Sequence, residues 1–439
     1  MAIRATNRNN SISYLDTAFS NPIRDPLWGH IYLDDGMMKL LDTAPVLQLH
    51  RIKQLGPCHQ VYPGATHTRL NHSLGVLHLA RRMLRSLLAH PDMPDVSLES
   101  VKGFLCAALL HDTGHFPYTH SLKELPLVDH EVLTGRIVQE EPIAGILRTQ
   151  IGTDPAAVAA IVDQSMPTNS LNENEITFFR HILSSPVDPD KLDYLNRDAY
   201  FCGVPYGTQD TDFVLNQIVP HPQSGLGLSQ NGISALENLL FSKYLMYRAV
   251  YWHRTVRIAT GMIKKALYLS LENGSIQAAD LYQLDDELFF ARMEERNPPD
   301  LPLITAVRER HLYKSILELP FQPENPAHTR LTNLKNRIDL EATIAKALSS
   351  CTGTSILPRH VLIDIPESIS FEVDMPVLGP QGWQPYTQVR SVFTPQVVQD
   401  FTAALRLIRI AVAPEIANEP NILQSGLQAA TELLHNGMD

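Results

Sequence analysis

The sequence predicts a mostly α-helical protein with a small α+β unit near its C-terminal end. Apolar residues recur at three- and four-residue intervals through much of residues 20–270, which is the spacing of amphipathic helices. The chain has 31 prolines and 22 glycines, a ratio that favours many punctuated helices over disorder. β-Forming residues cluster in "RHVLIDIP" and "SISFEVDMPVL", beyond residue 355, so we expect strands there.

Three segments of the first half are expected to form helices. Residues 73–90, "SLGVLHLARRMLRSLLAH", repeat leucine at helical intervals. Leu98–Leu110 is apolar nearly all round, which is typical of a helix inside a bundle. In "VDPDKLDYLNRDAYFCG", Asp188 can cap a helix, Pro189 suits its first position and Gly203 can end it.

The second half opens with the segment that we expect to be the longest helix. Residues 234–274 contain no proline, and Ser234 and Glu237 stand in capping-box spacing at its start. Residues 394–413, "TPQVVQDFTAALRLIRIAVA", predict another helix. Proline-rich joints such as "RNPPDLPL" indicate loops between shorter helices. The expected regions are a main helical domain at 1–275, a helical extension at 276–350 and a small α+β region at 351–439.

Composition restricts the class of partner and the compartment. The formal net charge of −11 disfavours a protein that binds nucleic acid over its whole surface, but it allows a local basic pocket for phosphates. No apolar run of membrane-spanning length and no signal-peptide core are present, so we expect a soluble, cytoplasmic protein with no membrane partner. The four cysteines form no CxxC pair, which indicates reduced thiols rather than a disulfide framework. They are Cys58, Cys106, Cys202 and Cys351.

A His-Asp pair at the end of a buried helix is the first chemical signal. It stands in "CAALLHDTGHFPYTH", residues 106–120, as His111 and Asp112. Burying an imidazole beside a carboxylate is costly unless a positive charge compensates, and a divalent metal ion does so well. A His-Asp dipeptide also occurs by chance, so the pair needs partners from elsewhere in the chain.

Two further residues can complete a metal site. His72 stands near Gly75, whose missing side chain allows another helix to approach closely. Asp190 opens its own helix, and Tyr194 and Asp198 follow at steps of four, so all three lie on one face. A site of two histidines and two aspartates suits Mn, Fe, Zn or Mg, and the carboxylates favour the harder ions. The pattern leaves the identity of the metal open.

These residues match, in type and order, the motif of the HD superfamily of metal-dependent phosphohydrolases: His, then His-Asp, then Asp. Longer segments are more specific. They are "IRDPLWGHIYLDD", "LLDTAPVLQLHRIKQLG", "VYPGATHTRLNHSLGVLHLA", "ALLHDTGHFPYTH", "DHE" and "DPDKLDYLNRDAYFCGV". Over about residues 20–270 the chain resembles the HD-domain deoxynucleoside triphosphate (dNTP) triphosphohydrolases. The resemblance implies an HD-domain helical core, which places the catalytic domain in region 1–275.

The resemblance also implies a role for individual residues. The metal ligands are His72, His111, Asp112 and Asp190. The catalytic group is His115, His120, His130 and Glu131. The substrate contacts are Gln54, Arg69, Lys191, Tyr194, Asp198, Lys243 and Tyr251. The implied reaction converts a dNTP to a deoxynucleoside and inorganic triphosphate, and the implied assembly is a homo-oligomer, in the family a tetramer.

Two departures from the family pattern concern the catalytic histidines. Asn71 stands where the family usually has glutamate, and Lys123 stands three residues after His120, where a carboxylate commonly orients a histidine. Glu124 or Glu131 is a candidate replacement. Without either, the histidine loses its protonation partner and the rate falls.

Other departures concern regulation and base recognition. Leu47 and His50 replace a glutamine and an arginine of the family's nucleotide-regulated interface, which makes activation by guanine nucleotides doubtful. Trp252 replaces a glutamine near the base, so the sequence does not rank the dNTPs. Lys243, Tyr247, Tyr251 and Arg254 lie at helical steps, and on spacing alone the two tyrosines are better explained by packing at the edge of the core than by binding.

Two other functions fit the same residues. One is hydrolysis of another phosphoester, such as a nucleoside monophosphate or cyclic nucleotide, because HD ligands do not define the leaving group. The other is a nucleotide-binding regulator without turnover, which the departures at Asn71 and Lys123 would explain. A purely structural metal site is disfavoured, because such sites are usually closed and rich in cysteine.

Overall fold

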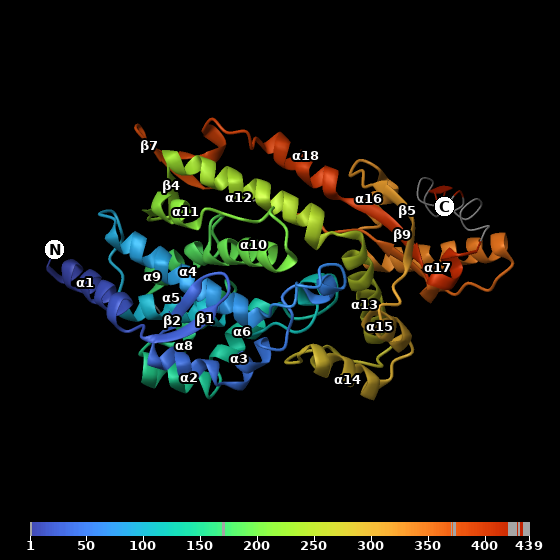
Figure 1. The fold of residues 1–439 in the computed structure, drawn as a ribbon, viewed down its shortest axis with the longest axis horizontal. Coiled ribbons are helices and arrows are strands. Elements are labelled where there is room, and N and C mark those ends of the chain that lie inside the picture. The colour runs from blue at the N-terminus through green and yellow to red at the C-terminus, as the bar shows by residue number, and fades with distance from the viewer. Residues whose placement is uncertain are drawn as a thin grey trace.

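The computed structural model describes residues 2–168, 172–369, 371, 375–419, 428, 431 and 432. Over these residues the protein is mostly α-helical, as predicted, with three small sheets. Figure 1 shows the N-terminal helices gathered on one side and helices α13, α15 and α17 on the other. None of the described helices is both long and apolar enough to cross a lipid bilayer.

The N-terminal segment contacts the two long helices of the first half, residues 69–89 and 98–110. Its first strand pairs antiparallel with the second, with Asp25 opposite Gly29. Asp25 closes the turn between them, because its Oδ1 accepts hydrogen bonds from the amides of Leu27 and Trp28 at 2.9 and 2.8 Å. The elements are α1 (Ala2–Thr17), β1 (Asn21–Asp25), β2 (Gly29–Leu33), α2 (Asp35–Leu41), α3 (Ala44–Leu49) and η1 (Gly56–Gln60).

The three helices predicted in the first half are confirmed. α4 (Arg69–Ala89) begins at a capping box formed by Thr68 and Asn71, and α5 spans Leu98–Leu110. α10 (Pro189–Cys202) has its predicted cap and terminator. The other elements here are η2 (Thr119–Leu122), α6 (His130–Val138), α7 (Ile143–Ile146), η3 (Leu147–Ile151), α8 (Pro155–Val162), α9 (Glu173–Leu183), α11 (Thr211–Gln217), β3 (Ile218–His221) and β4 (Gly225–Ser229).

The predicted single long helix at 234–274 is wrong. The chain forms α12 (Ile233–Met246), a π-helical turn η5 (Tyr247–Tyr251) and α13 (Arg254–Glu272), and Figure 1 shows it changing direction between α12 and α13. The break follows from local hydrogen bonds, since the His253 side chain caps α13 by accepting from the amide of Thr255.

The predicted capping box at the start of this segment is also wrong. Gly232 occupies the N-cap position of α12, and because glycine has no side chain it cannot form a capping hydrogen bond. Glu237 instead accepts a 2.7 Å hydrogen bond from the Ser391 hydroxyl, so a tertiary contact takes the side chain that the local pattern assigned to the cap. α4, with 21 residues, is longer than α12 or α13.

The C-terminal part contains both helices and strands, as predicted, but one boundary differs. The segment predicted as a helix at 394–413 ends its helix at Leu405, and Leu407–Val412 forms the central strand of a sheet. This strand is buried between two neighbours, where "LIRIAV" suits the pleated surface. The predicted strand in "RHVLIDIP" is confirmed, whereas residues 370 and 372–374 of "SISFEVDMPVL" lie outside the described residues.

The C-terminal strands form one sheet and add β7 and β8 to the sheet that β3 and β4 begin. The sheet order is β5-β9-β6 in one and β3-β4-β7-β8 in the other. The elements are α14 (Asp286–Arg296), α15 (Leu301–Arg308), β5 (Lys314–Pro320), α16 (Pro326–Arg330), α17 (Leu334–Thr352), β6 (Val361–Asp364), β7 (Pro376–Gly379), β8 (Gly382–Pro385), α18 (Pro395–Leu405), β9 (Leu407–Val412) and α19 (Pro414–Ala417).

Buried apolar side chains form two clusters. The first runs from Leu15 to Val256 and takes in Phe371–Leu405 of the C-terminal part. The second joins α13 to α15, α17 and the β5-β9-β6 sheet, and it also includes Phe116 and Leu122. The segment that follows the His-Asp pair is therefore packed against the C-terminal part. The domain boundaries at 275 and 350 stay predictions.

Candidate active site

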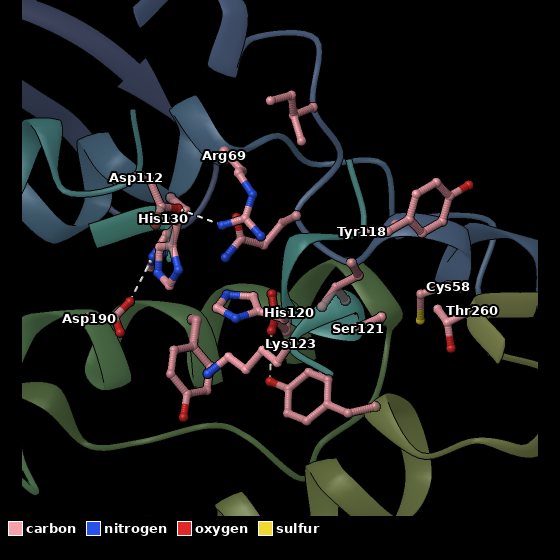
Figure 2. A pocket seen from close by; sticks show the side chains of 18 of the residues that line it. Cys58, Arg69, Asp112, Tyr118, His120, Ser121, Lys123, His130, Asp190 and Thr260 are labelled. Atoms are coloured by element: carbon pink, nitrogen blue, oxygen red, sulfur yellow. Dashed lines mark hydrogen bonds and ion pairs between the residues drawn. The ribbon is translucent and has the colours of Figure 1, made fainter. Parts of the chain in front are cut away.

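A cavity of about 650 Å³ lies beside the His-Asp pair, a volume of the size that holds small-molecule ligands. Its lining comes from many parts of the chain, which include the start of α4, the end of α5, the segment 118–131, helix α10 and the break between α12 and α13. Figure 2 shows Asp112, His130 and Asp190 on one side of this cavity and His120 and Lys123 below Arg69. The sequence-predicted residues that line it are Gln54, Arg69, His72, His111, Asp112, His120, His130, Glu131, Asp190, Tyr194, Asp198, Lys243 and Tyr251.

Three of the four predicted metal ligands converge, and we call them the ligand cluster: His72, His111 and Asp190. Their ligand atoms all lie within 4.8 Å of one another. Asp190 Oδ1 is 2.8 Å from His72 Nε2 and 3.8 Å from His111 Nε2. The two rings meet edge to face, with an interplanar angle of 77°. Three separate helices thus bring their donors to one point.

His111 is prepared for a metal ion by its hydrogen bonding. Its Nδ1 lies 2.9 Å from the carbonyl oxygen of Ala108, which fixes the proton on Nδ1 and leaves a lone pair on Nε2. Nε2 is buried and has no hydrogen-bond partner among the described residues. A buried acceptor without a donor costs free energy, so this nitrogen fits a cation.

Asp112, the fourth predicted ligand, lies between two groups of histidines. Its Oδ1 is 3.3 Å from His111 Nε2 and 3.0 Å from His115 Nε2, and its Oδ2 accepts a 2.8 Å hydrogen bond from Arg69 Nη1. Burial raises the pKa of Asp112, but His115, His111 and Arg69 outweigh it and hold that pKa well below its ordinary value. Asp112 is therefore ionised and faces the ligand cluster.

Asp193, which sequence reasoning missed, supports the ligand cluster from behind. Its Oδ2 lies 2.8 Å from His72 Nδ1, and its Oδ1 accepts a 2.6 Å hydrogen bond from Trp28 Nε1. A carboxylate behind a metal-binding imidazole orients the ring and increases its basicity. The signal was present in the sequence, because Asp193 follows Asp190 by three residues and so lies on the same face of α10.

The close approach at Gly75 explains how Asp193 reaches His72. A Cβ atom on Gly75 would lie 1.8 Å from Asp193 Oδ1, so any other residue would push α10 away from α4. Burial lowers the pKa of His72, but hydrogen bonds to Asp190 and Asp193 overcome that and raise it to about 10. Without an ion, the two carboxylates thus attract a proton to the place that a metal would take.

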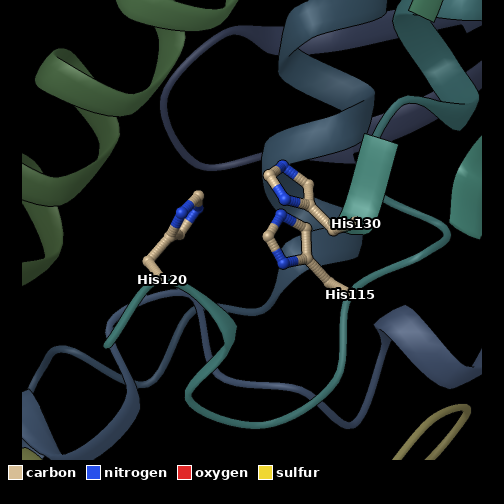
Figure 3. Close-up of side chains that lie close together, drawn as sticks. All are labelled: His115, His120 and His130. Atoms are coloured by element: carbon tan, nitrogen blue, oxygen red, sulfur yellow. The ribbon is translucent and has the colours of Figure 1, made fainter. Parts of the chain in front are cut away.

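His115, His120 and His130 form a second group, which we call the histidine stack (Figure 3). The rings of His115 and His130 are stacked with centroids 4.0 Å apart and an interplanar angle of 27°, and His120 lies 4.8 and 5.2 Å from them. Imidazole lone pairs lie in the ring plane, so two stacked rings direct them side by side rather than at one ion. Of the three, His120 and His130 line the cavity and can contact a substrate, whereas His115 is buried and does not line it.

The histidine stack is neutral in the free protein. Burial and then the charge of Arg69 hold the pKa of His115 well below its ordinary value, and the same two causes do so for His120. Burial also lowers the pKa of His130. Gly114 positions the stack, since its amide donates to Thr134 Oγ1 at 2.9 Å and a Cβ there would lie 2.2 Å from the carbonyl oxygen of His130.

Another part of the cavity lining presents a carboxylate together with hydroxyl and amide groups. Asp198 Oδ2 accepts a 2.7 Å hydrogen bond from the Tyr251 hydroxyl, and its Oδ1 lies 2.8 Å from His67 Nε2. Burial raises the pKa of Tyr194 and of Tyr251 well above the ordinary value, so both phenols stay protonated. Gln54 Oε1 is buried without a partner in the described chain. His67, which was not predicted, orients Asp198.

The two predicted lysines of the substrate site, Lys191 and Lys243, each contact another group of the protein. Lys191 Nζ donates to Asp188 Oδ2 at 2.5 Å and to the Ser185 carbonyl at 3.1 Å. Lys243 is buried, with its ammonium 5.6 Å from the ring centroid of Phe371. Lys243 lines the cavity together with Arg69, so a polyanion there would meet both charges, whereas Lys191 is not one of the lining residues.

Asn71, which departs from the family pattern, and the two candidate replacement carboxylates, Glu124 and Glu131, have distinct structural roles. The Asn71 side chain accepts the amide of Thr68 at 2.9 Å and so caps α4. Glu124 pairs with Lys264 and Arg337, away from the histidines. Glu131 Oε1 lies 3.8 Å from His130 Nε2, so Glu131 is the candidate partner of that ring.

Comparison with known proteins gives the family. The HD domain matches residues 69–170, a span that begins at Arg69 and includes the first three predicted ligands. The HD associated region matches residues 215–379. The chain is an HD-domain protein.

Several proteins are similar to this HD-domain protein. An uncharacterized protein of Methanocaldococcus jannaschii is 32% identical over 309 residues, which are 69% of this chain and 61% of that protein. A "Deoxynucleoside triphosphate triphosphohydrolase SAMHD1 homolog" of Dictyostelium discoideum is 27% identical over 336 residues, 72% of this chain and 64% of that protein. The matches thus span less than two thirds of either relative's length. A solved structure of a hypothetical protein from Aquifex aeolicus has the same fold, with a TM-score of 0.67, 24% identity and coverage of 94% of this chain and 99% of that one.

Proposed function

We propose that this HD-domain protein is a metal-dependent dNTP triphosphohydrolase, which converts a dNTP to a deoxynucleoside and inorganic triphosphate. The carrying observation is the ligand cluster, where donors from three helices lie within 4.8 Å of one another at the wall of a cavity. The similarity to SAMHD1-type triphosphohydrolases supports this choice among phosphate substrates.

The residues that would hold the metal are His72, His111, Asp112 and Asp190. The unpartnered Nε2 of His111 and the ionised carboxylates fit a divalent ion such as Mn, Mg, Fe or Zn. When bound, such an ion supplies Lewis-acid polarisation of a phosphoryl oxygen and makes water a better nucleophile.

Arg69 and the lysines would bind the phosphate chain, and this binding changes the histidine stack. The stack is neutral because of burial and the charge of Arg69. The negative charge of a polyphosphate opposes both effects and favours the protonated imidazole. His120 or His130 then becomes able to donate a proton to the oxygen of the leaving triphosphate. Proton donation is thereby coupled to the arrival of substrate.

Asp198, Gln54 and Tyr251, which also line the cavity, would select the sugar. Asp198, held by His67 and Tyr251, offers a fixed carboxylate to a 3′-hydroxyl, and the free Oε1 of Gln54 offers a second acceptor. The Tyr251 ring is held by its hydrogen bond to Asp198, so it would restrict the space beside the ribose 2′ position.

A product assay tests the proposal. Purified protein with each divalent metal and each dNTP should release inorganic triphosphate, and Asp112→Ala should not. Release of only pyrophosphate or orthophosphate would instead indicate another phosphoester as substrate. Binding of dNTP without any product would indicate the regulatory alternative. The same assay with added nucleotide tests activation. Light scattering tests the tetramer that we propose by analogy, and cell fractionation tests the cytoplasmic location that we propose.

A further inference from the structure

The short helix η2, which carries His120, is fixed at its end by a buried ion-pair network. Glu124 accepts hydrogen bonds from Lys264 Nζ and, at 2.5 Å, from Arg337 Nη2. The side chains of Lys264 and Arg337 are only 8% and 3% exposed, so this network is protected from solvent. Because α13 and α17 supply the two cations, the segment is tied to the second apolar cluster.

The neighbouring residue, Lys123, lies at the cavity. Lys123 follows the last residue of η2, and while Glu124 is anchored to α13 and α17, the Lys123 side chain is one of those that line the cavity. Lys123 lines the cavity together with His120 and Ser121, and it is exposed there (Figure 2). Its ammonium makes no ion pair with any carboxylate of the described chain.

The positive charge around His120 is not fully compensated. Arg69 is 4% exposed and uses Nη1 for Asp112, but its Nε is buried without a partner in the part of the chain that the structure describes. Lys123 adds a second charge close enough to act on both His120 and His130. A buried donor without an acceptor and a lysine without a counter-ion together fit a bound anion.

We propose that Lys123 is a phosphate-binding residue, which with His120 and Arg69 forms a subsite for the terminal phosphates of a polyphosphate chain. The ligand class is an inorganic tripolyphosphate or the β,γ-phosphates of a nucleoside triphosphate, and the inference rests on the proposed function. In this chain a cation thus occupies the place where a carboxylate would orient the histidine, and it acts on the leaving group instead.

The test measures binding of tripolyphosphate to the full-length protein in saturating magnesium by isothermal titration calorimetry. Lys123→Gln should weaken binding by about tenfold or more, the contribution of one charge-assisted hydrogen bond, while Lys123→Arg should stay close to wild type. Lys346→Gln is the matched control, since Lys346 is an exposed lysine of α17 that does not line the cavity. Circular dichroism of each variant checks folding.

Each outcome decides the inference. Equal affinity of Lys123→Gln and wild type overturns it, and so does a wild-type protein that does not bind tripolyphosphate. If tripolyphosphate binding depends on Lys123 but dNTPs yield no triphosphate, the subsite stands and the proposed reaction fails. If triphosphate is released and Lys123→Gln changes neither KM nor kcat, the proposed reaction stands and the subsite fails.

Discussion

The ligand cluster and the histidine stack contain the same kind of side chain but differ in geometry. In the ligand cluster, the rings of His72 and His111 cross at 77°, and a carboxylate lies between their nitrogens. In the histidine stack, His115 and His130 lie nearly parallel at 27°. Ligand atoms lie within 4.8 Å of one another in both groups, so the directions of the lone pairs, which lie in the ring planes, are what distinguish the two. Asp112 lies between the two groups and touches both.

The largest expected effect comes from breaking the ligand cluster. His72→Ala removes one donor, and we expect the protein to lose its metal and its activity to fall by about a thousandfold or more, because metal catalysis contributes several kcal/mol. Mass spectrometry measures the metal content, and release of triphosphate measures the activity. Full metal content in His72→Ala would place the ion elsewhere.

Breaking the histidine stack should slow the reaction without removing the ion. His130→Ala should lower kcat by about a hundredfold or more, the usual contribution of a general acid, while metal content stays at the wild-type value. His120→Ala is the paired variant. Loss of metal in either one would contradict the separation of roles.

Removing support behind the ligand cluster should have a smaller effect. Asp193→Asn keeps the size of the side chain but weakens its interaction with His72, and we expect a loss of about tenfold to a hundredfold in metal affinity. Competition with a chelator measures that affinity. Because Asp193 also pairs with Arg197 at 2.8 Å, thermal unfolding of the metal-free variant separates a folding defect from a metal defect.

The smallest effect concerns pH. Burial and Arg69 hold the pKa of His120 below its ordinary value, so the free ring is neutral at pH 7, and a bound polyphosphate raises that pKa. Binding therefore takes up a proton, and affinity for tripolyphosphate should rise as pH falls from 8 to 6.5, by at most about tenfold per pH unit for one proton. Titration in buffers of different ionisation enthalpy measures the proton. His120→Gln should reduce the uptake.

Local patterns were sufficient where an element's ends are set by its own residues. Asp188, Pro189 and Gly203 bound α10 as predicted, because capping and a left-handed terminator at φ 67° depend on nearby backbone alone. Where the predictions were wrong, tertiary contacts determined the structure instead. Glu237 accepts a hydrogen bond from Ser391 instead of capping α12. Residues 407–412 form a strand because they pair with a neighbouring strand on each side.

The candidate site divides in the same way. The order His72, His111, Asp112 and Asp190 was readable from the motif, but the angle between rings and the partner of each carboxylate were not. Asp193 and His67 act through other residues, and their contacts bridge 121 and 131 positions of sequence. Spacing within one helix contains no information on such distant pairs, apart from the shared face of Asp190 and Asp193.

Anomalous diffraction from manganese-soaked crystals tests the central claim most directly, since it locates the ion without reference to activity. The account predicts one strong peak per chain, bounded by His72, His111, Asp112 and Asp190. A peak among His115, His120 and His130, or none between His72 and Asp190, would contradict it.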